Sequence, residues 1–358
     1  MNRILLVLGV SWLALFCGSC KEKPEKAPES EIAMDVEQEV TKSTLEEINQ
    51  EIIQNPESPN GYYKRAFYYK EQFDFEKAIE DINRALKLTP EVPALTYLKA
   101  DILFNQGSYL QNPALYEQSE IYLLETLKLD STYLEALVLE GRINMGKPNF
   151  EKAMANFDAA LRQDKFHAPA YFYKAMVFEL IGQKENAKSS YQTAIETKGD
   201  YYDALHHMGN LLASEMDEKA LSYYDAALDI EPNSYEVLRN KGLFLIKMEQ
   251  YQEARMAFNL ILSFEPANEE CYFNIGNTYV ASYRDDMDQY SKDTIIDHAM
   301  ENFQKAMELN PQYIDAIYNL GWMYEFRGNK KQAIELYQQV LEIDDYHQPT
   351  LDRLSAID

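Results

Sequence analysis

Few side chains in this sequence are spaced for acid–base or metal chemistry. The chain has five histidines among 358 residues, and only His206 and His207 are neighbours. Successive side chains on a helix point about 100° apart. The two imidazoles therefore cannot share a metal ion in the i, i+4 arrangement of helical zinc sites. A structural role, or a polar role on a binding surface, is favoured for both.

One acidic stretch has the residue types of a calcium site but not the spacing. It contains Asp285, Asp286, Asp288 and Asp293. A calcium-binding loop alternates its acidic ligands and needs a glycine at the turn, and this stretch has neither feature. A solvated acidic loop is favoured instead. The sequence also lacks the G-x-S-x-G, Walker A and H-E-x-x-H motifs. We therefore predict no enzyme activity, no catalytic or metal site, no cofactor and no small-molecule substrate.

The charge of the chain restricts the classes of partner. The formal net charge is −25. Such a surface repels nucleic acid and anionic lipid headgroups, so no nucleic-acid partner is expected, and long-range attraction favours protein partners with basic segments. The alternative is that the acidity only keeps a long molecule soluble.

The N-terminus has the features of a cleaved export signal. Arg3 precedes an apolar run over residues 4–16, which is shorter than the ~20 residues that span a bilayer. Gly18 and Ser19 then precede Cys20, which resembles the lipobox of bacterial lipoproteins. That resemblance implies removal of residues 1–19, lipidation of Cys20 and attachment to an outer membrane, facing the periplasm or the exterior. A plain secretory signal is the alternative. Residues 20–42 are charged and predict a disordered tether.

Two segments with the same pattern of residue types determine the fold prediction. Residues 271–279 read C-Y-F-N-I-G-N-T-Y, and residues 316–324 read A-I-Y-N-L-G-W-M-Y. An A-x3-aromatic motif follows each, with Ala299 before Phe303 and Ala333 before Tyr337. This pattern resembles the tetratricopeptide repeat (TPR), a 34-residue pair of antiparallel helices. The resemblance implies an all-α solenoid, a right-handed superhelix of helix pairs in which each repeat packs on its neighbours.

The repeat register extends through most of the chain. It predicts a solenoid over 43–358, with a lone second helix at 43–55 as an N-terminal cap, a C-terminal cap helix at 348–358, and eight repeats at 59–92, 93–133, 134–167, 168–201, 202–234, 235–268, 269–313 and 314–347. Repeat two has seven additional residues, and Asn112-Pro113 predicts a helix start there, so we expect both of its helices to be lengthened. Repeat seven has eleven additional residues between its helices. In each repeat we expect Gly or Ala at position 8 to oppose Ala at position 20.

In this family the first helices of the repeats line a concave groove that binds peptides. The resemblance therefore implies a groove in which aromatic rings hold side chains and amides hold backbone. Several rings could instead pack within or between repeats. Positions 5, 6 and 9 of the repeats supply the candidate groove residues, which are Tyr63, Phe67, Tyr97, Arg142, Phe172, His206, Asn210, Arg239, Asn240, Phe273, Asn274, Asn277, Tyr318, Asn319 and Trp322.

These features predict a membrane-anchored adaptor or scaffold. It would bind a protein or peptide partner in its concave groove, in envelope assembly, secretion or cell-wall machinery. The alternative is a permanent structural subunit of an outer-membrane complex that uses its edge or convex face. Of the three cysteines, Cys17 lies in the predicted signal peptide, and Cys271 lies at a core position of repeat seven and is expected to be a small packed hydrophobe.

Overall fold

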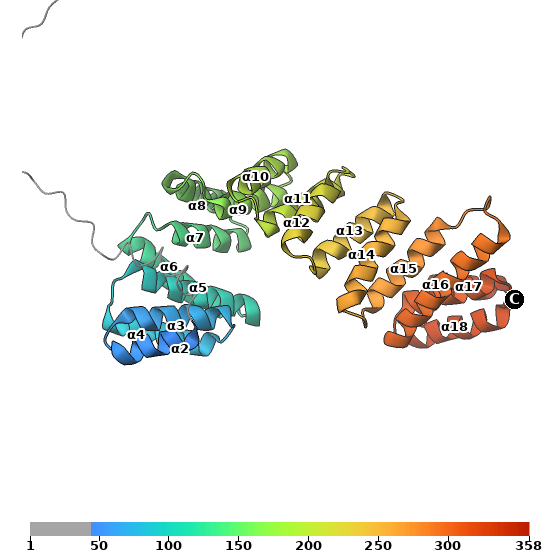
Figure 1. The fold of residues 1–358 in the computed structure, drawn as a ribbon, viewed down its shortest axis with the longest axis horizontal. Helices are drawn as coiled ribbons and strands as arrows, with labels where there is room; N and C mark the ends of the chain where they lie inside the picture. Colours follow the sequence, from blue (N-terminus) through green and yellow to red (C-terminus); the bar gives the residue numbers. More distant parts are fainter. Residues whose placement is uncertain (1–43, 358) are drawn as a thin grey trace, which may run out of the picture. The chain divides into compact units, whose positions relative to one another are not determined.

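A computed structural model describes residues 44–357. These residues form eighteen helices, α2 to α19, and no strand, so the all-α prediction is confirmed (Figure 1). The chain divides into two compact units, residues 1–136 and 137–358, which we describe separately. The predicted signal peptide, the lipidation site Cys20 and the tether at 20–42 lie outside the described residues.

The first unit contains a lone helix followed by two helix pairs. Thr44 caps the lone helix by accepting a hydrogen bond from the Glu47 backbone, and the Glu47 side chain accepts one from the Thr44 backbone in return. Each helix packs on the next along the chain. The five helices are α2 (Leu45–Gln54), α3 (Pro59–Glu71), α4 (Phe75–Leu88), α5 (Pro93–Leu110) and α6 (Pro113–Leu129).

The second unit continues the same alternation. Its first helix begins three residues before the boundary between the units. Asn149, Asn268 and Asn329 accept backbone N–H groups at helix starts, as N-caps do. The helices are α7 (Leu134–Gly146), α8 (Phe150–Gln163), α9 (Ala168–Leu180), α10 (Lys184–Thr197), α11 (Tyr202–Ser214), α12 (Ala220–Ile230), α13 (Tyr235–Lys247), α14 (Tyr251–Phe264), α15 (Glu269–Ser282), α16 (Gln289–Leu309), α17 (Ile314–Phe326), α18 (Lys330–Ile343) and α19 (Gln348–Ile357).

Both insertions are largely helical. In repeat two, α5 has 18 residues and α6 has 17, whereas α3 has 13 and α4 has 14, so the predicted lengthening is confirmed. The Asn112 side chain caps α6 and Pro113 occupies its first turn. In repeat seven, seven of the eleven additional residues lie in α16, which has 21 residues where α14 and α18 have 14, and which begins at Gln289 with Asp288 as its cap. The connection before α16 is therefore shorter than the polar segment 284–292.

In five of the repeats the two helices cross where a glycine faces an aromatic ring. A Cβ atom added at Gly276 would lie 2.6 Å from the Phe303 ring, and one added at Gly242 would lie 2.7 Å from the Phe258 ring. Both rings are fully buried. The ring at position 24 is thus the nearest neighbour of the glycine at position 8. That position 8 also opposes Ala at position 20 stays a prediction.

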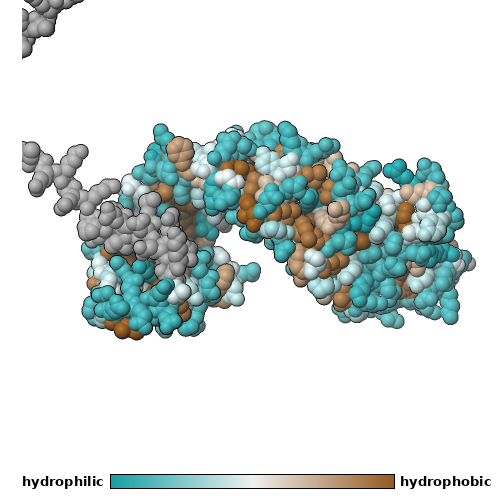
Figure 2. All heavy atoms as spheres, in the orientation of Figure 1, coloured by the Kyte–Doolittle hydropathy of each residue, from teal (hydrophilic) through white to brown (hydrophobic). Residues whose placement is uncertain are grey.

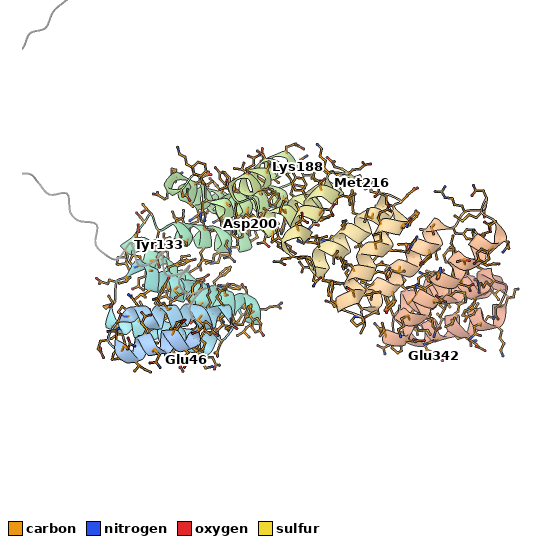
Figure 3. The ribbon with its side chains drawn as sticks, viewed as in Figure 1. Glu46, Tyr133, Lys188, Asp200, Met216 and Glu342 are labelled. Carbon is orange, nitrogen blue, oxygen red and sulfur yellow. The ribbon has the colours of Figure 1, made fainter. Side chains whose placement is uncertain are left out.

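Neighbouring repeats are also joined by polar contacts. Lys174 on α9 donates to Asp158 on α8 at 2.6 Å, and Lys241 on α13 pairs with Asp225 on α12 in the same way. Lys188, labelled on α10 in Figure 3, lies 3.1 Å from the Glu215 carboxylate after α11. None of the helices between residues 44 and 357 is both long and apolar enough to span a bilayer.

Candidate functional site

The first helices of successive repeats carry a line of polar side chains that contact one another. In the second unit these helices are α9, α11, α13, α15 and α17, and we call the surface that they share the first-helix face. The Asn240 amide on α13 donates to Asn210 Oδ1 on α11 at 3.0 Å and lies 3.1 Å from His206 Nε2. Asn210 Oδ1 also accepts the Tyr224 hydroxyl at 2.9 Å. Position 6 of one repeat thus bonds position 9 of the repeat before it.

The same contact recurs between α15 and α17. The Asn319 amide donates to Asn277 Oδ1 at 3.0 Å. Between α13 and α15 an ion pair replaces it, with Arg239 Nε donating to Glu270 Oε1 at 2.7 Å and the Tyr235 hydroxyl donating to Glu270 Oε2 at 3.0 Å. The asparagines, Tyr235, Arg239 and Glu270 are partly exposed, whereas His206 and Tyr224 are buried. The asparagines therefore form a row of polar side chains that is fixed by hydrogen bonds between repeats and that a ligand could reach.

Burial and these contacts alter two ionisation equilibria. Burial lowers the pKa of His206, and the neighbouring His207 lowers it further. A neutral imidazole fits the geometry, because His206 Nε2 can then accept from the Asn240 amide. Burial alone would raise the pKa of the Glu270 carboxyl, but hydrogen bonds from Arg239 and Tyr235 hold it below its usual value.

The rings at position 5 are held inside the repeats. Phe172 packs between Tyr191 at position 24, with ring centroids 5.8 Å apart, and Tyr201 at the end of the repeat, at 5.3 Å. The same triad recurs in repeat seven, where Phe273 lies 5.9 Å from Phe303 and 5.0 Å from Tyr313.

A third triad closes repeat eight, where Tyr318 lies 5.8 Å from Tyr337 and 5.5 Å from His347. In the first unit Tyr97 packs on Tyr133, labelled in Figure 3, at 5.2 Å. The partners Tyr201, Tyr313 and His347 are not among the residues predicted from the repeat register. Aromatic residues recurring at the last position of the repeats were the available signal.

These contacts divide the candidate groove residues. Tyr63, Phe67 and Phe172 are less than a tenth exposed, as are His206 and Asn274. The three rings offer little surface to a ligand, so we do not retain them as contact residues. For the partly exposed remainder, ligand contact stays a prediction: Tyr97, Arg142, Asn210, Arg239, Asn240, Phe273, Asn277, Tyr318, Asn319 and Trp322.

Two further reactive groups, the Cys271 thiol and the Tyr337 hydroxyl, belong to buried residues. The Cys271 thiol is buried, and burial raises its pKa to about 12, so it stays protonated at neutral pH. The Tyr337 hydroxyl donates to Glu325 Oε2 at 2.8 Å. Within residues 44–357 no three His, Cys, Asp or Glu side chains are grouped so that they could hold a metal ion.

Three segments match family models described as tetratricopeptide repeat, at residues 59–92, 168–201 and 302–335. Human Superkiller complex protein 3 is 21% identical over 296 residues, which cover 81% of this chain and 18% of the relative. The TPR repeat-containing protein MJ1428 of Methanocaldococcus jannaschii is 24% identical in an alignment 375 residues long. The alignment covers 82% of this chain and 65% of the relative. The chain thus spans less than two thirds of either relative.

Solved structures of the same kind are similar at low identity. YrrB, a TPR protein with an unusual peptide-binding site, is 22% identical with a TM-score of 0.46 over 56% of this chain and 97% of its own. A tetratricopeptide repeat protein from Parabacteroides merdae is 14% identical with a TM-score of 0.39 over 84% of this chain and 98% of its own. The family-model matches, together with the recurring helix pairs and glycine–ring crossings, identify the chain as a tetratricopeptide repeat protein.

Proposed function

We propose that this protein is a membrane-anchored scaffold that holds a protein or peptide partner on its first-helix face. The tetratricopeptide fold supports a role in protein interaction. The observation that carries the proposal is the polar row of Asn210, Asn240, Asn277 and Asn319, which is partly exposed and fixed by contacts between repeats. Fixed amides can bond the backbone of an extended peptide without first losing side-chain freedom.

The surface chemistry favours a partner with basic segments. The net charge of −25 attracts cations over long range and disfavours nucleic acid. Figure 2 shows hydrophilic residues over much of the visible surface of the second unit, with apolar residues gathered near α12 and α13. We expect partner capture to weaken as salt is raised, because salt screens exposed charges.

Crosslinking in native membranes tests where the partner binds. A photo-crosslinking amino acid replaces Asn277 on α15 in one protein and Met256 on α14 in another. Met256 is 67% exposed, so both positions are accessible, but it belongs to a second helix. Mass spectrometry should identify a partner that is crosslinked from position 277 and not from position 256. Equal capture from both positions would remove the support for the first-helix face.

The alternative is a permanent structural subunit of an outer-membrane complex. One observation favours it, because Met256 and Leu260 leave apolar side chains exposed one helical turn apart on α14. A structural subunit would crosslink from position 256 and would co-purify with fixed partners in constant ratio. A scaffold that binds reversibly would instead be recovered partly as the free chain.

The membrane anchor is a separate part of the proposal, supported by the G-S-C sequence that ends at Cys20. Cys20→Ser should abolish labelling by an alkyne-tagged fatty acid and release the protein from the membrane fraction. One acyl chain binds membranes only marginally, whereas two or more anchor a protein stably. A wild-type protein without label would refute the lipid anchor. The proposed site of action is the bacterial envelope, at the outer membrane, in assembly, secretion or cell-wall machinery.

A further inference from the structure

An apolar pocket lies where the lengthened helix α16 meets the ends of α15 and α17. It has a volume of about 130 Å³. Val280 and Tyr283 line it from the end of α15, and Trp322, Met323 and Phe326 line it from the last turns of α17. Ile295, Ile296 and Ala299 of α16 complete the wall. Residues 289–295 are the additional turns of α16, so the insertion contributes Ile295 to this pocket.

The walls of the pocket are held in place. The Tyr283 and Phe326 rings meet edge to face at 5.4 Å, and the Arg353 guanidinium lies 5.4 Å from the Trp322 ring centroid. Phe326 nevertheless remains 51% exposed. An exposed aromatic beside an apolar hollow leaves surface that an incoming apolar group could cover.

The volume limits what can enter. An apolar cavity of about 150 Å³ is large enough to hold benzene. A pocket of about 130 Å³ therefore suits a single aromatic or branched aliphatic side chain and is too small for a drug-sized ligand or a cofactor, which need about 300 Å³ or more.

A polar hollow of about 550 Å³ adjoins the pocket and shares Tyr283, Ile296 and Phe326 with it. Its two cations already have acceptors in the protein. Lys292 Nζ donates to the Asp285 carbonyl at 2.7 Å, and Arg327 Nη2 lies 2.7 Å from Asp297 Oδ1.

In the lining of the hollow the charges of Lys292 and Arg327 balance those of Asp293 and Asp297, so a negative field at this site comes from the further acidic residues around it. The Asp293 carboxylate accepts from the neutral amide of Gln289 at 3.0 Å and is exposed. Asp285 and Asp286 are exposed on the connection before α16 and add to the negative field. A cationic side chain beside the apolar anchor would therefore be attracted here.

We propose that this pocket is a specificity subsite that takes one Phe or similar apolar side chain of a peptide, with the adjacent Lys or Arg of that peptide beside Asp293. The inference rests on the proposed protein-interaction function, and it adds a sequence requirement for the partner. The partner must carry an apolar side chain next to a basic residue, and the insertion of repeat seven helps to form the site that binds them.

The tryptophans provide a direct probe. The sequence has two, Trp12 and Trp322. Trp12 lies in the predicted signal peptide, so with Trp12→Phe all indole fluorescence comes from Trp322, which lines the pocket, whether or not residues 1–19 are removed. The ligand is a capped Gly-Ser peptide that contains one Phe-Lys pair. We expect it to shift Trp322 emission to shorter wavelength, because the Phe ring excludes water from the indole. Replacing Phe with Ala in the peptide should weaken binding by at least about tenfold, and replacing Lys with Glu should weaken it further.

Variants of the protein locate the binding. Ile295→Phe fills the pocket from a partly exposed position and should weaken binding of the Phe-Lys peptide by about tenfold or more. Leu260→Phe is the matched control on α14, where a 43% exposed aliphatic residue takes the same change, and it should bind normally. Asp293→Asn keeps the shape of the side chain and should reduce the preference for Lys over Glu in the peptide. Circular dichroism of each variant verifies the fold.

Several outcomes would overturn the proposal. These are an emission spectrum unchanged by the Phe-Lys peptide, equal binding by folded Ile295→Phe, and no preference for Lys over Glu. An emission shift that depends on protein concentration, with a doubled mass, would show that a second copy fills the pocket. If position 277 still captures a partner while the pocket fails these tests, the proposed scaffold function stands and only the subsite is wrong.

Discussion

At the scale of single residues, His206 couples the polar row to pH. Its imidazole is buried and its pKa is lowered below the ordinary 6.5, so the unfolded chain takes up the proton first as the pH falls. Stability that is present above pH 6.5 is therefore lost as the pH falls below it. We expect the free energy of unfolding, measured by urea titration, to decrease from pH 7.5 to pH 5.5.

The matched variant for this prediction is His206→Gln. Glutamine keeps an acceptor for the Asn240 amide, which contacts His206 Nε2 at 3.1 Å, and does not titrate. The free energy of unfolding should therefore change less with pH in this variant than in the wild type. The remaining slope belongs in part to His167, whose pKa is also lowered by burial. Identical slopes in wild type and variant would contradict the assignment to His206.

Gly276 shows how closely the two helices of a repeat approach. Gly276→Ala would bring a methyl group 2.6 Å from the Phe303 ring, and overpacking of this kind costs about 1–3 kcal/mol. Alanine has a better helix propensity than glycine, which stabilises the helix by ~1 kcal/mol. We therefore expect the free energy of unfolding, measured by urea titration, to decrease by about 1 kcal/mol. Repeat two already pairs Ala100 with Leu123 at these positions, both fully or almost fully buried. In a Phe303→Leu background the alanine should therefore be neutral or stabilising, and an additive double mutant would refute the steric explanation.

At the scale of elements, a cap determines how the first insertion folds. The Asn112 side chain accepts the Ala114 backbone N–H at 3.1 Å at the start of α6. Removing an N-cap costs about 0.5–2 kcal/mol. Asn112→Ala should thus lower the free energy of unfolding by that amount and increase amide exchange in the first turns of α6. Asn112→Ser should keep most of the wild-type stability, because serine is also a good N-cap. Unchanged exchange in the alanine variant would show that packing against α5 alone holds the helix start.

At the scale of the whole molecule, stability is distributed from repeat to repeat. The last helix, α19, covers Ala333 and Tyr337 with Ile357, which is 7% exposed, and Lys330 Nζ donates to the Ile357 carbonyl at 3.0 Å. Burying one such aliphatic side chain contributes about 1.5–3 kcal/mol. Removing residues 348–358 should increase hydrogen exchange in α17 and α18, because each repeat in an array packs only on its neighbours. Exchange in α9 to α12 should not change, and a general loss of protection would contradict this array behaviour.

The sequence by itself determined the class of fold and most of the helix register. Glycine, alanine and aromatic residues recur at fixed spacing because every repeat presents the same crossing to the next, so a single register predicts many helices. Local signals such as Asn112-Pro113 also sufficed to predict the lengthened helices, since a cap acts within one turn.

Only the tertiary structure decided which rings and amides a ligand can reach. Phe172 and Trp322 both belong to positions that the family places in the groove, yet Phe172 is buried between Tyr191 and Tyr201 and Trp322 lines an open pocket. The partners that cover a ring come from a different helix or from the end of the repeat, at separations that no local pattern encodes. The pocket likewise depends on where the additional turns of α16 meet α15 and α17, because its volume is set by the packing of three helices rather than by the sequence of any one of them.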